Sequence, residues 1–371
     1  MKDILEKILG KNVKDVVKLH GDASYRAYYR ATMADGSTFI IMQMPPGKSS
    51  ASEEITNFSG RHNELPFINV DHFLASCGLP VPKIFKYDEA EKIMILEDLG
   101  DGLMFKFVAN AQAAEREKYY KKAIDLLIEM QRKTTPHPLP SPLKGEGECV
   151  ALQRSFDATL LNWEFDHFRE YLIEERGSVK MEARDKELFE TETRKITEEI
   201  LKIPYCFTHR DFQSRNLIVR GDGSLALIDF QDALMGPQVY DLVALLRDSY
   251  VELKWGMVER LIGYYNSNVA QDFSPADRIG RSSATTTSAD RKDLRYKVAG
   301  LKSCATNFHL VTLQRKMKDA GRFVYIDRVK KNPNFMQYIP TTLGYVKNAF
   351  ERTGDAGELL KMLKKYVPEL R

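Results

Sequence analysis

The chain has 371 residues, which is enough for two domains or two lobes. Apolar residues make up 43% of the chain, an ordinary share for a folded soluble protein. No apolar run approaches the roughly 18 residues of a membrane span. Residues Met1–Glu6 lack the apolar stretch of a signal peptide. The four cysteines form no C-x-x-C pair, so we expect a reduced, cytoplasmic protein without a membrane segment or a zinc site.

The net charge of +3 is unevenly distributed. From Tyr240 onward the chain has 14 acidic and 23 basic residues, a balance of +9, so the first 239 residues carry −6. A basic C-terminal third disfavours a strongly cationic substrate there and suits a neutral or anionic one. The basic residues are scattered and form no recognisable nucleic-acid-binding module, so we expect no nucleic acid as partner.

Residues 1–100 have the pattern of an antiparallel sheet. A short helix opens the chain, and strands with turns between them are expected at Val13–His20, Tyr25–Thr32, Thr38–Met44, Lys83–Tyr87 and Lys92–Glu97. Gly21–Ser24 forms a turn, residues 49–66 are polar and irregular, and Val70–Ser76 is a short helix. The segment Glu97–Gly100 ends this first lobe.

Residues 101–371 change to a helical period and form a second lobe. A long amphipathic helix is expected after Ala111, and further helices at Phe156–Glu175, Lys186–Leu201, Tyr240–Tyr250, Val258–Asn266, Leu294–Met317, Ile326–Val346 and Gly357–Tyr366. A proline-rich loop at 136–147 and a Ser/Thr-rich loop at 277–293 interrupt them.

A strand, a polar loop and a hairpin occupy the middle of the chain. The loop contains His209, Arg210, Asp211 and Asn216 in the order His-Arg-Asp-x-x-x-x-Asn, the catalytic-loop pattern of kinases. Gly221–Gly223 then joins two apolar runs as a hairpin turn. The hairpin would place Asn216 beside Asp229, which ends the second run.

This set of residues suits phosphoryl transfer from ATP. Asp211 is the catalytic residue that accepts the hydroxyl proton, while Asn216 and Asp229 offer hard oxygens to Mg²⁺. His209 has a structural role in the loop. Asp241, at the start of a helix, either braces the loop or is a simple helix-end acid. The separate motifs occur by chance, but their combination indicates a kinase-type site.

Two features disfavour a protein kinase and favour a small-molecule acceptor. Asp229 and Phe230 are followed by Gln231 in place of Gly, and only 11 residues separate Asp229 from Asp241. This interval leaves no room for a long activation segment.

Three segments resemble the aminoglycoside phosphotransferase/choline kinase superfamily: Thr208–Leu217, Ile228–Ala233 and Gly236–Leu242. Within it, four further segments resemble the bacterial anomeric kinases of cell-wall recycling, namely Gly21–Arg30, Pro45–Pro46, Leu96–Gly100 and Leu245–Asp248. Those enzymes phosphorylate C1 of N-acetylmuramate and N-acetylglucosamine with ATP and Mg²⁺. The similarity spans roughly residues 16–350 and is weakest over 48–66, 136–150 and 275–293.

The resemblance implies a bilobal, protein-kinase-like α+β fold. A small antiparallel sheet (1–100) would cover the nucleotide, and a larger, mostly helical lobe (101–371) would hold the catalytic and acceptor sites. The hairpin with Ser24 and Arg26 would lie over the phosphates, and backbone groups near Glu97 and Leu99 would bind the adenine.

One departure concerns the phosphates. Most superfamily members have a lysine on the third strand, but here that strand is Phe39–Met44 and has none. The sugar-kinase group also tends to lack it. Because the phosphates still need cations, we expect Arg26 or Arg30 to supply one.

The expected acceptor is an amino sugar, and Arg247 and Asp248 are candidate contacts, although a helix-surface salt bridge is an equal alternative. The partners are then a sugar and ATP, with no obligate protein partner. An aminoglycoside, homoserine or choline-type acceptor is the first alternative. A catalytically inactive nucleotide-binding module is the second, and the intact Asp211, Asn216 and Asp229 disfavour it.

Overall fold

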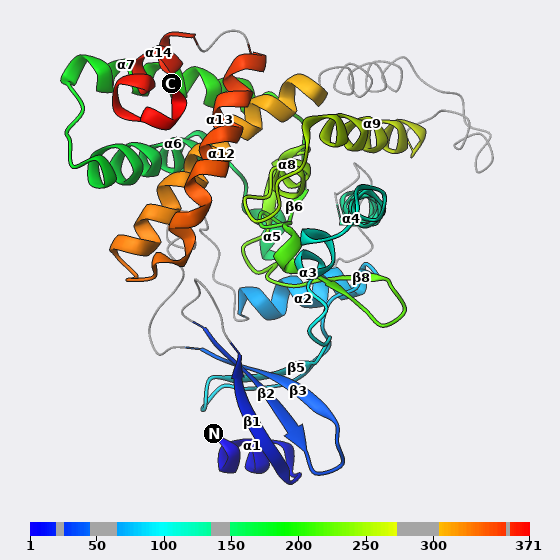
Figure 1. The fold of residues 1–371 in the computed structure, drawn as a ribbon. Helices are drawn as coiled ribbons and strands as arrows, with labels where there is room; N and C mark the ends of the chain where they lie inside the picture. The colour runs from blue at the N-terminus through cyan, green and yellow to red at the C-terminus, as the bar shows by residue number, and fades with distance from the viewer. Residues whose placement is uncertain (20–25, 45–64, 135–148, 273–303, 354–356) are drawn as a thin grey trace.

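The computed structural model describes residues 1–19, 26–44, 65–134, 149–272, 304–353 and 357–371. They form a β-sheet at one end of the molecule and a larger helical part at the other, drawn at the bottom and top of Figure 1. The expected α+β architecture, with an antiparallel sheet and a helical majority, is confirmed. No helix in the described ranges combines the length and the apolar character that crossing a membrane requires.

The sheet has five antiparallel strands in the order β1-β2-β3-β5-β4. The strands are β1 (Val13–Leu19), β2 (Ala27–Met33), β3 (Thr38–Gln43), β4 (Ile84–Asp88) and β5 (Ile93–Glu97). The helix α1 (Lys2–Leu9) precedes them. Side chains alternate between its faces. On β3, Ile41 packs with Leu5 of α1 in a small separate core, whereas its neighbour Met42 belongs to the core of the helical lobe.

The helical lobe is built from helices of several kinds. In chain order they are α2 (Pro66–Ser76), α3 (Met104–Ala109), α4 (Ala113–Thr134), α5 (Val150–Gln153), α6 (Ala158–His167), the π-helix η1 (Phe168–Glu175), α7 (Ala183–Ile200), α8 (Tyr240–Leu246), α9 (Trp255–Asp272), α12 (Cys304–Arg328), the 3₁₀ turn η3 (Pro333–Tyr338), α13 (Ile339–Thr353), α14 (Gly357–Tyr366) and the 3₁₀ turn η4 (Pro368–Leu370). Although α2 lies within residues 1–100, its Phe67 packs 5.0 Å from the Phe230 ring in the helical lobe. The boundary at residue 100 stays a prediction.

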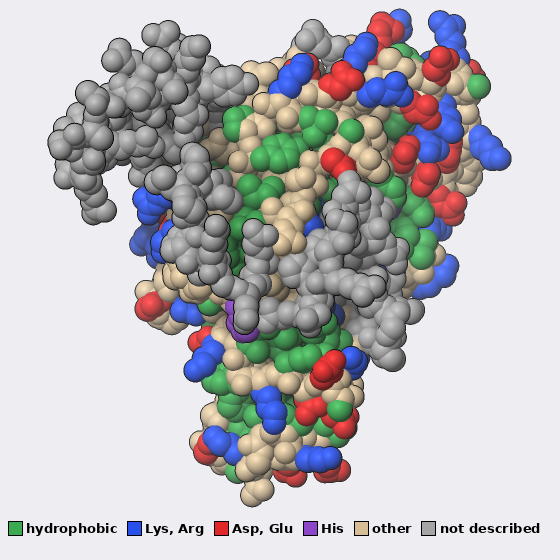
Figure 2. All heavy atoms as spheres, turned by 180° about the vertical axis from the view of Figure 1, so that it is seen from behind, with side chains coloured by type: hydrophobic (Ala, Val, Ile, Leu, Met, Phe, Trp, Pro, Cys, Tyr) green, Lys and Arg blue, Asp and Glu red, His purple; other side chains and the backbone are tan. Residues whose placement is uncertain are grey.

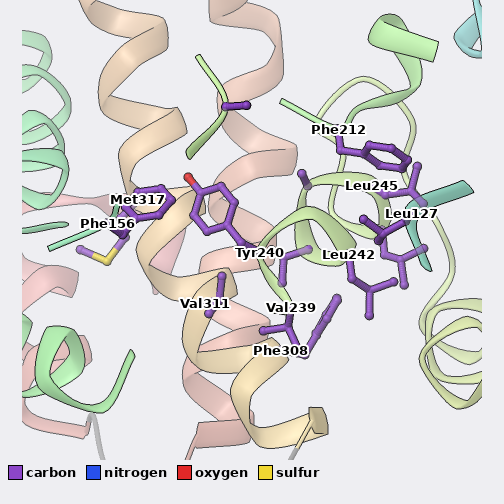
Figure 3. Packing of buried hydrophobic residues seen from close by; sticks show 14 of the residues in the cluster. Leu127, Phe156, Phe212, Val239, Tyr240, Leu242, Leu245, Phe308, Val311 and Met317 are labelled. Atoms are coloured by element: carbon purple, nitrogen blue, oxygen red, sulfur yellow. The ribbon is translucent and has the colours of Figure 1, made fainter. Parts of the chain in front are cut away.

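The core of the helical lobe surrounds α8, all of whose side chains are buried. Figure 3 shows Leu242 and Leu245 of α8 packed in this core with Phe308 and Val311 of α12. Apolar burial of this extent stabilises the lobe. It fixes α12 beside the segment that carries the His-Arg-Asp motif.

Charged side chains of both signs are mixed on the surface around α7 and α14, at the upper right of Figure 2. Lys365 of α14 pairs there with Asp185 of α7 at 3.0 Å. This face therefore has no large area of a single charge over these two helices.

Several expected helix boundaries are wrong. The expected helix Phe156–Glu175 is an α-helix that continues as the π-helix η1, and the expected helix Tyr240–Tyr250 already ends at Leu246. No single helix spans Ile326–Val346, because Lys331 has a left-handed φ of 56° and Pro333 follows it. The strand β9 (Leu234–Pro237), which pairs with β6 (Tyr205–Thr208), was not expected.

Other predictions fall largely or wholly outside the described residues. They are the turn Gly21–Ser24, the loops at 49–66, 136–147 and 277–293, and the start of the helix Leu294–Met317.

Candidate active site

The motif lies on a short strand, a loop and a hairpin. After β6 the chain forms the 3₁₀ turn η2 (Ser214–Asn216), and then β7 (Leu217–Val219) pairs with β8 (Leu225–Leu227) in the expected hairpin. The amide of Ile228 donates to the Asn216 carbonyl at 3.1 Å. Asn216 and Asp229 therefore leave the same end of the hairpin, as their spacing predicted.

A glycine ties this hairpin to the segment between the lobes. The amide of Val219 donates to the Gly102 carbonyl at 2.6 Å. A Cβ atom at position 102 would lie 2.3 Å from the Val219 carbonyl oxygen, so only glycine permits the contact. The sheet is thus anchored next to the catalytic hairpin.

Asp241 braces the catalytic loop. Its carboxylate accepts the amides of His209 at 2.7 Å and of Arg210 at 3.0 Å, which supports the bracing alternative over the simple helix-end acid. Arg210 has a φ of 78°, a conformation that is strained for a residue with a side chain and needs such support. Burial raises the pKa of Asp241 to about 7, although these two hydrogen bonds favour its charged form.

His209 joins the His-Arg-Asp loop to the segment that precedes Asp229. Its Nε2 lies 3.1 Å from the carbonyl oxygen of Ile228, the residue before Asp229. Asp229 itself has a φ of 65°. Burial lowers the pKa of His209 to about 4, so the ring is neutral and acts through geometry, consistent with the expected structural role.

Asp211 is held by a fully buried arginine from α12. One terminal nitrogen of Arg315 lies 3.2 Å from the Asp211 Oδ1, and the other donates to the Arg210 carbonyl at 2.6 Å. The Asp211 side chain keeps 39% of its surface exposed. Burial opposes its ionisation, but Lys318 and Arg315 outweigh burial and lower its pKa below the usual value. An anionic, accessible carboxylate results.

Asn216 and Asp229 present oxygens of the kind that Mg²⁺ binds. The Asn216 amide nitrogen donates to the Asp211 carbonyl at 2.8 Å, which turns its Oδ1 to the opposite side, and Gln231 donates to the Asp229 Oδ1 at 3.0 Å. Burial and the nearby Asp211 raise the pKa of Asp229 to about 6. A cation between these residues would relieve that repulsion, so the donor set fits Mg²⁺.

No cluster of three or more His, Cys, Asp or Glu residues in the described segments is arranged to hold a metal by itself. Mg²⁺ keeps water and phosphate oxygens among its ligands and does not require such a cluster.

The residues expected near the nucleotide differ in their positions. Arg26 hydrogen bonds with Tyr28 and is close enough to Asp229 to lower its pKa, in opposition to the larger effect of burial. Arg30 instead binds Asp98 through two nitrogens, at 2.7 and 3.0 Å, and Asp101 at 2.9 Å. These pairs link β2 to the segment after β5, so we no longer assign Arg30 to the phosphates.

The remaining nucleotide predictions stay open. Ser24 lies outside the described residues. Glu97 ends β5, where its side chain accepts the Lys83 amide at 3.0 Å, and Leu99 lies half-buried in the segment that joins β5 to α3.

The expected acceptor contacts Arg247 and Asp248 need correction, because both side chains are buried and bound to the protein. Asp248 is 0% exposed and accepts the Ser214 amide at 3.0 Å, the Ser214 hydroxyl at 2.5 Å and the Tyr250 amide at 3.0 Å. Arg247 donates to Asn348 at 2.7 Å and lies 4.8 Å from the Trp255 ring centroid. Asp248 braces η2, and Arg247 anchors α8, so neither is proposed to touch the acceptor.

The sequence reading missed the contribution of α12. Arg315 and Lys318 lie close to Asp211 in the structure, although they are more than 100 residues away from it in the sequence. The expected helix Leu294–Met317 includes Arg315 without a role and ends before Lys318, and the basic excess of the C-terminal third is the only signal for either residue.

Comparison with known proteins decides the family. The model of the phosphotransferase enzyme family matches residues 15–275, well over half of the chain. The chain belongs to the phosphotransferase enzyme family. The superfamily resemblance of its motifs is thereby confirmed, and the protein is a phosphotransferase.

Among related proteins are two named N-acetylmuramate/N-acetylglucosamine kinase. The one from Pseudomonas putida is 26% identical over 92% of this chain and 85% of its own length. The one from Neisseria meningitidis is 24% identical over 99% of this chain and 95% of its own length.

Solved structures of the same fold include a choline kinase from Streptococcus pneumoniae, with a TM-score of 0.55, 16% identity and coverage of 95% of this chain and 97% of that one. An ADP-bound aminoglycoside phosphotransferase has a TM-score of 0.56 and 14% identity, and the match covers 94% of this chain and 97% of that one. These structures support the protein-kinase-like fold.

Proposed function

We propose that this phosphotransferase transfers the terminal phosphoryl group of ATP, with Mg²⁺, to a hydroxyl group of N-acetylmuramate or N-acetylglucosamine. We further propose the anomeric hydroxyl as the acceptor. The observation that carries the proposal is the accessible Asp211 carboxylate, held anionic by Arg315 and Lys318, beside the oxygens of Asn216 and Asp229. The names of the relatives from Pseudomonas putida and Neisseria meningitidis support the choice of sugar.

Asp211 orients the acceptor hydroxyl and accepts its proton. An anomeric hydroxyl is more acidic than an ordinary alcohol, so a carboxylate with a low pKa suffices. Arg315 fixes the position of this carboxylate and the strained Arg210 carbonyl beside it. The positioning contribution to catalysis requires that rigidity.

Asn216 and Asp229 would hold Mg²⁺ through the Asn216 Oδ1 and the Asp229 carboxylate. The bound metal and ATP supply the phosphoryl donor with its negative charge partly neutralised. Arg26, next to Asp229 and Tyr28, would bind the phosphates in place of the missing third-strand lysine. Backbone groups near Glu97 and Leu99 would bind the adenine.

A coupled ADP-release assay tests this proposal. The purified protein is given ATP, Mg²⁺ and a panel containing both amino sugars, an aminoglycoside, homoserine and choline. We expect turnover with the amino sugars that requires Mg²⁺ and disappears in Asp211→Ala. Turnover only with another acceptor, or nucleotide binding with no turnover on any acceptor, would reject it.

A further inference from the structure

One face of α12 runs away from Asp211 and carries cations. Arg315, Lys318, Arg322 and Tyr325 are spaced by three, four and three residues, so they share a face of the helix, which we call the α12 strip. Arg315 contacts Asp211 at one end. Arg322 is seven residues further, about 10 Å along the helix axis. Lys318, between them, has a side chain that is 17% exposed.

The turn of α12 that faces Asp211 has more basic than acidic side chains. Asp319 binds Lys316 at 2.7 Å and Lys318 at 3.2 Å, and Arg315 lies 3.9 Å from it. These three cations share the carboxylate of Asp319, and Arg315 also contacts Asp211. Glu164, also nearby, is already paired with Arg210 at 2.9 Å. An anionic group placed beside Lys318 would find a favourable field.

Aromatic rings lie at the far end of the α12 strip. The guanidinium of Arg322 lies 4.7 Å from the Tyr325 ring centroid, and Tyr325 meets Tyr171 edge-on at 5.1 Å. The His167 ring is 3.9 Å from Trp163 and 5.4 Å from Tyr171. Trp163, Tyr171 and Tyr325 remain partly exposed. Such rings combine an apolar face with a polar edge, which suits contact with a sugar ring.

A close backbone contact sets the α12 strip against these rings. A Cβ atom at Gly321, between Lys318 and Arg322, would lie 2.3 Å from the His167 carbonyl oxygen and 2.7 Å from the Phe168 amide nitrogen. His167 ends α6, and Phe168 begins the π-helix η1. π-helical turns are rare and are enriched at functional sites. Here the irregular turn and Gly321 bring two helices together beside the catalytic loop.

From these observations we infer that the α12 strip is the acceptor site: Lys318 and Arg322 bind a carboxylate on the acceptor, and its sugar ring lies between these cations and Asp211, with the aromatic rings at the far end of the site. The inference rests on the proposed function and extends it to specificity. Of the two proposed sugars, only N-acetylmuramate has a carboxylate, on its lactyl group. The α12 strip would therefore distinguish an acidic amino sugar from its neutral counterpart.

The test is the ratio of kcat/KM for N-acetylmuramate to that for N-acetylglucosamine, in wild type, Lys318→Met and Arg322→Gln. Because both values come from the same preparation, the ratio does not depend on the fraction of folded enzyme. We expect each variant to lower the ratio about tenfold or more, the effect of losing one charge-assisted contact. Lys361→Met, on the exposed surface of α14, is the matched loss of one positive charge and should leave the ratio within about twofold of wild type.

A second comparison removes the charge from the substrate. Wild type should use the methyl ester of N-acetylmuramate much less efficiently than the free acid, and Arg322→Gln should reduce this preference. An equal loss for both sugars in Lys318→Met and Arg322→Gln would assign the cations to Asp211 or to the transferred phosphoryl group and overturn the inference. If wild type turns over N-acetylglucosamine with no preference between the acid and the ester, only the inference fails. If wild type uses neither sugar, the proposed function fails first.

Discussion

The guanidinium of Arg315 lies 3.2 Å from the carboxylate of Asp211, and both are held in place by the fold. Arg315 is 0% exposed and also binds the Arg210 carbonyl. A helix more than 100 residues further along the chain thus sets the position and the charge of Asp211, the proposed catalytic residue. Lysine cannot form both contacts from one planar group.

We predict that Arg315→Lys lowers kcat about 10- to 100-fold and leaves the KM for ATP nearly unchanged, because the lost contact acts on the reacting carboxylate. The pH profile of kcat adds a more specific readout. Since the positive charge of Arg315 helps to keep the pKa of Asp211 low, Arg315→Met, which removes this charge, should move the acidic limb of the profile to higher pH, and Arg315→Lys should move it less.

The control is Arg328→Gln, at the exposed end of the same helix, where Arg328 pairs with Asp327 at 3.6 Å. It should change neither kcat nor the profile. A fall in kcat for Arg315→Met without any shift of the acidic limb would mean that Arg315 acts only on the fold.

Arg26 and Arg30 should give different phenotypes. Arg26→Ala is expected to raise the KM for ATP several-fold, because Arg26 lies next to Asp229 and would bind the phosphates. Arg30→Ala should leave that KM nearly unchanged and lower the melting temperature, because it breaks the pairs with Asp98 and Asp101. Steady-state kinetics and thermal unfolding of both variants measure these two effects. An unchanged KM in Arg26→Ala would remove it from the phosphate site.

Asp248 should be a stability residue. We expect Asp248→Ala to lower the free energy of unfolding by about 3 kcal/mol, because three buried donors lose their acceptor. Asp248→Asn retains one acceptor oxygen and should lose less. Denaturant unfolding of the two variants measures the difference. If Asp248→Ala instead kept full stability and lost affinity for the sugar, the direct acceptor role would be restored.

The environment of Asp71 on α2 indicates that replacing it with Asn should stabilise the protein. It is 2% exposed, its Oδ1 has no hydrogen-bond partner among the described residues, and burial raises its pKa to about 7. The pKa of Asp71 in the unfolded state is near 4. The carboxyl group therefore loses its proton at a lower pH in the unfolded protein than in the folded one. The protonated Asp71 therefore contributes its full share to the free energy of unfolding below pH 4. This contribution falls as the pH rises from 4 towards 7, and above pH 7 it is lost.

Asp71→Asn lacks this ionisation. Its advantage over wild type should grow between pH 4 and 7 and reach about 1–3 kcal/mol at pH 8. Denaturant unfolding at pH 5 and pH 8 provides the measurement. A difference that does not change between these pH values would contradict the assignment of a buried, protonated carboxylate.

The sequence predicted the parts of the site that are local in the chain. The His-Arg-Asp loop and the hairpin lie within about 20 residues, so their spacing alone brings Asn216 to Asp229. Arg315 could not be found in this way, because its approach to Asp211 depends on the packing of α12 around α8. The burial of Arg247 and Asp248 depends on the same tertiary packing, so their local pattern alone predicted acceptor contacts.

The π-helix η1 could not be predicted from the sequence for a similar reason. The pattern of aromatic residues over Phe156–Glu175 is that of one continuous helix. Its change to a π-helix coincides with the close approach of Gly321, a tertiary contact that no local pattern encodes.

The most direct test of the central claim is the phosphorus NMR spectrum of the product formed from ATP, Mg²⁺ and N-acetylmuramate. We predict a sugar phosphate whose signal is a doublet from coupling to the anomeric proton, formed by wild type and absent with Asp211→Asn. A phosphate coupled to a methylene group, or the same product from Asp211→Asn at an undiminished rate, would contradict the account.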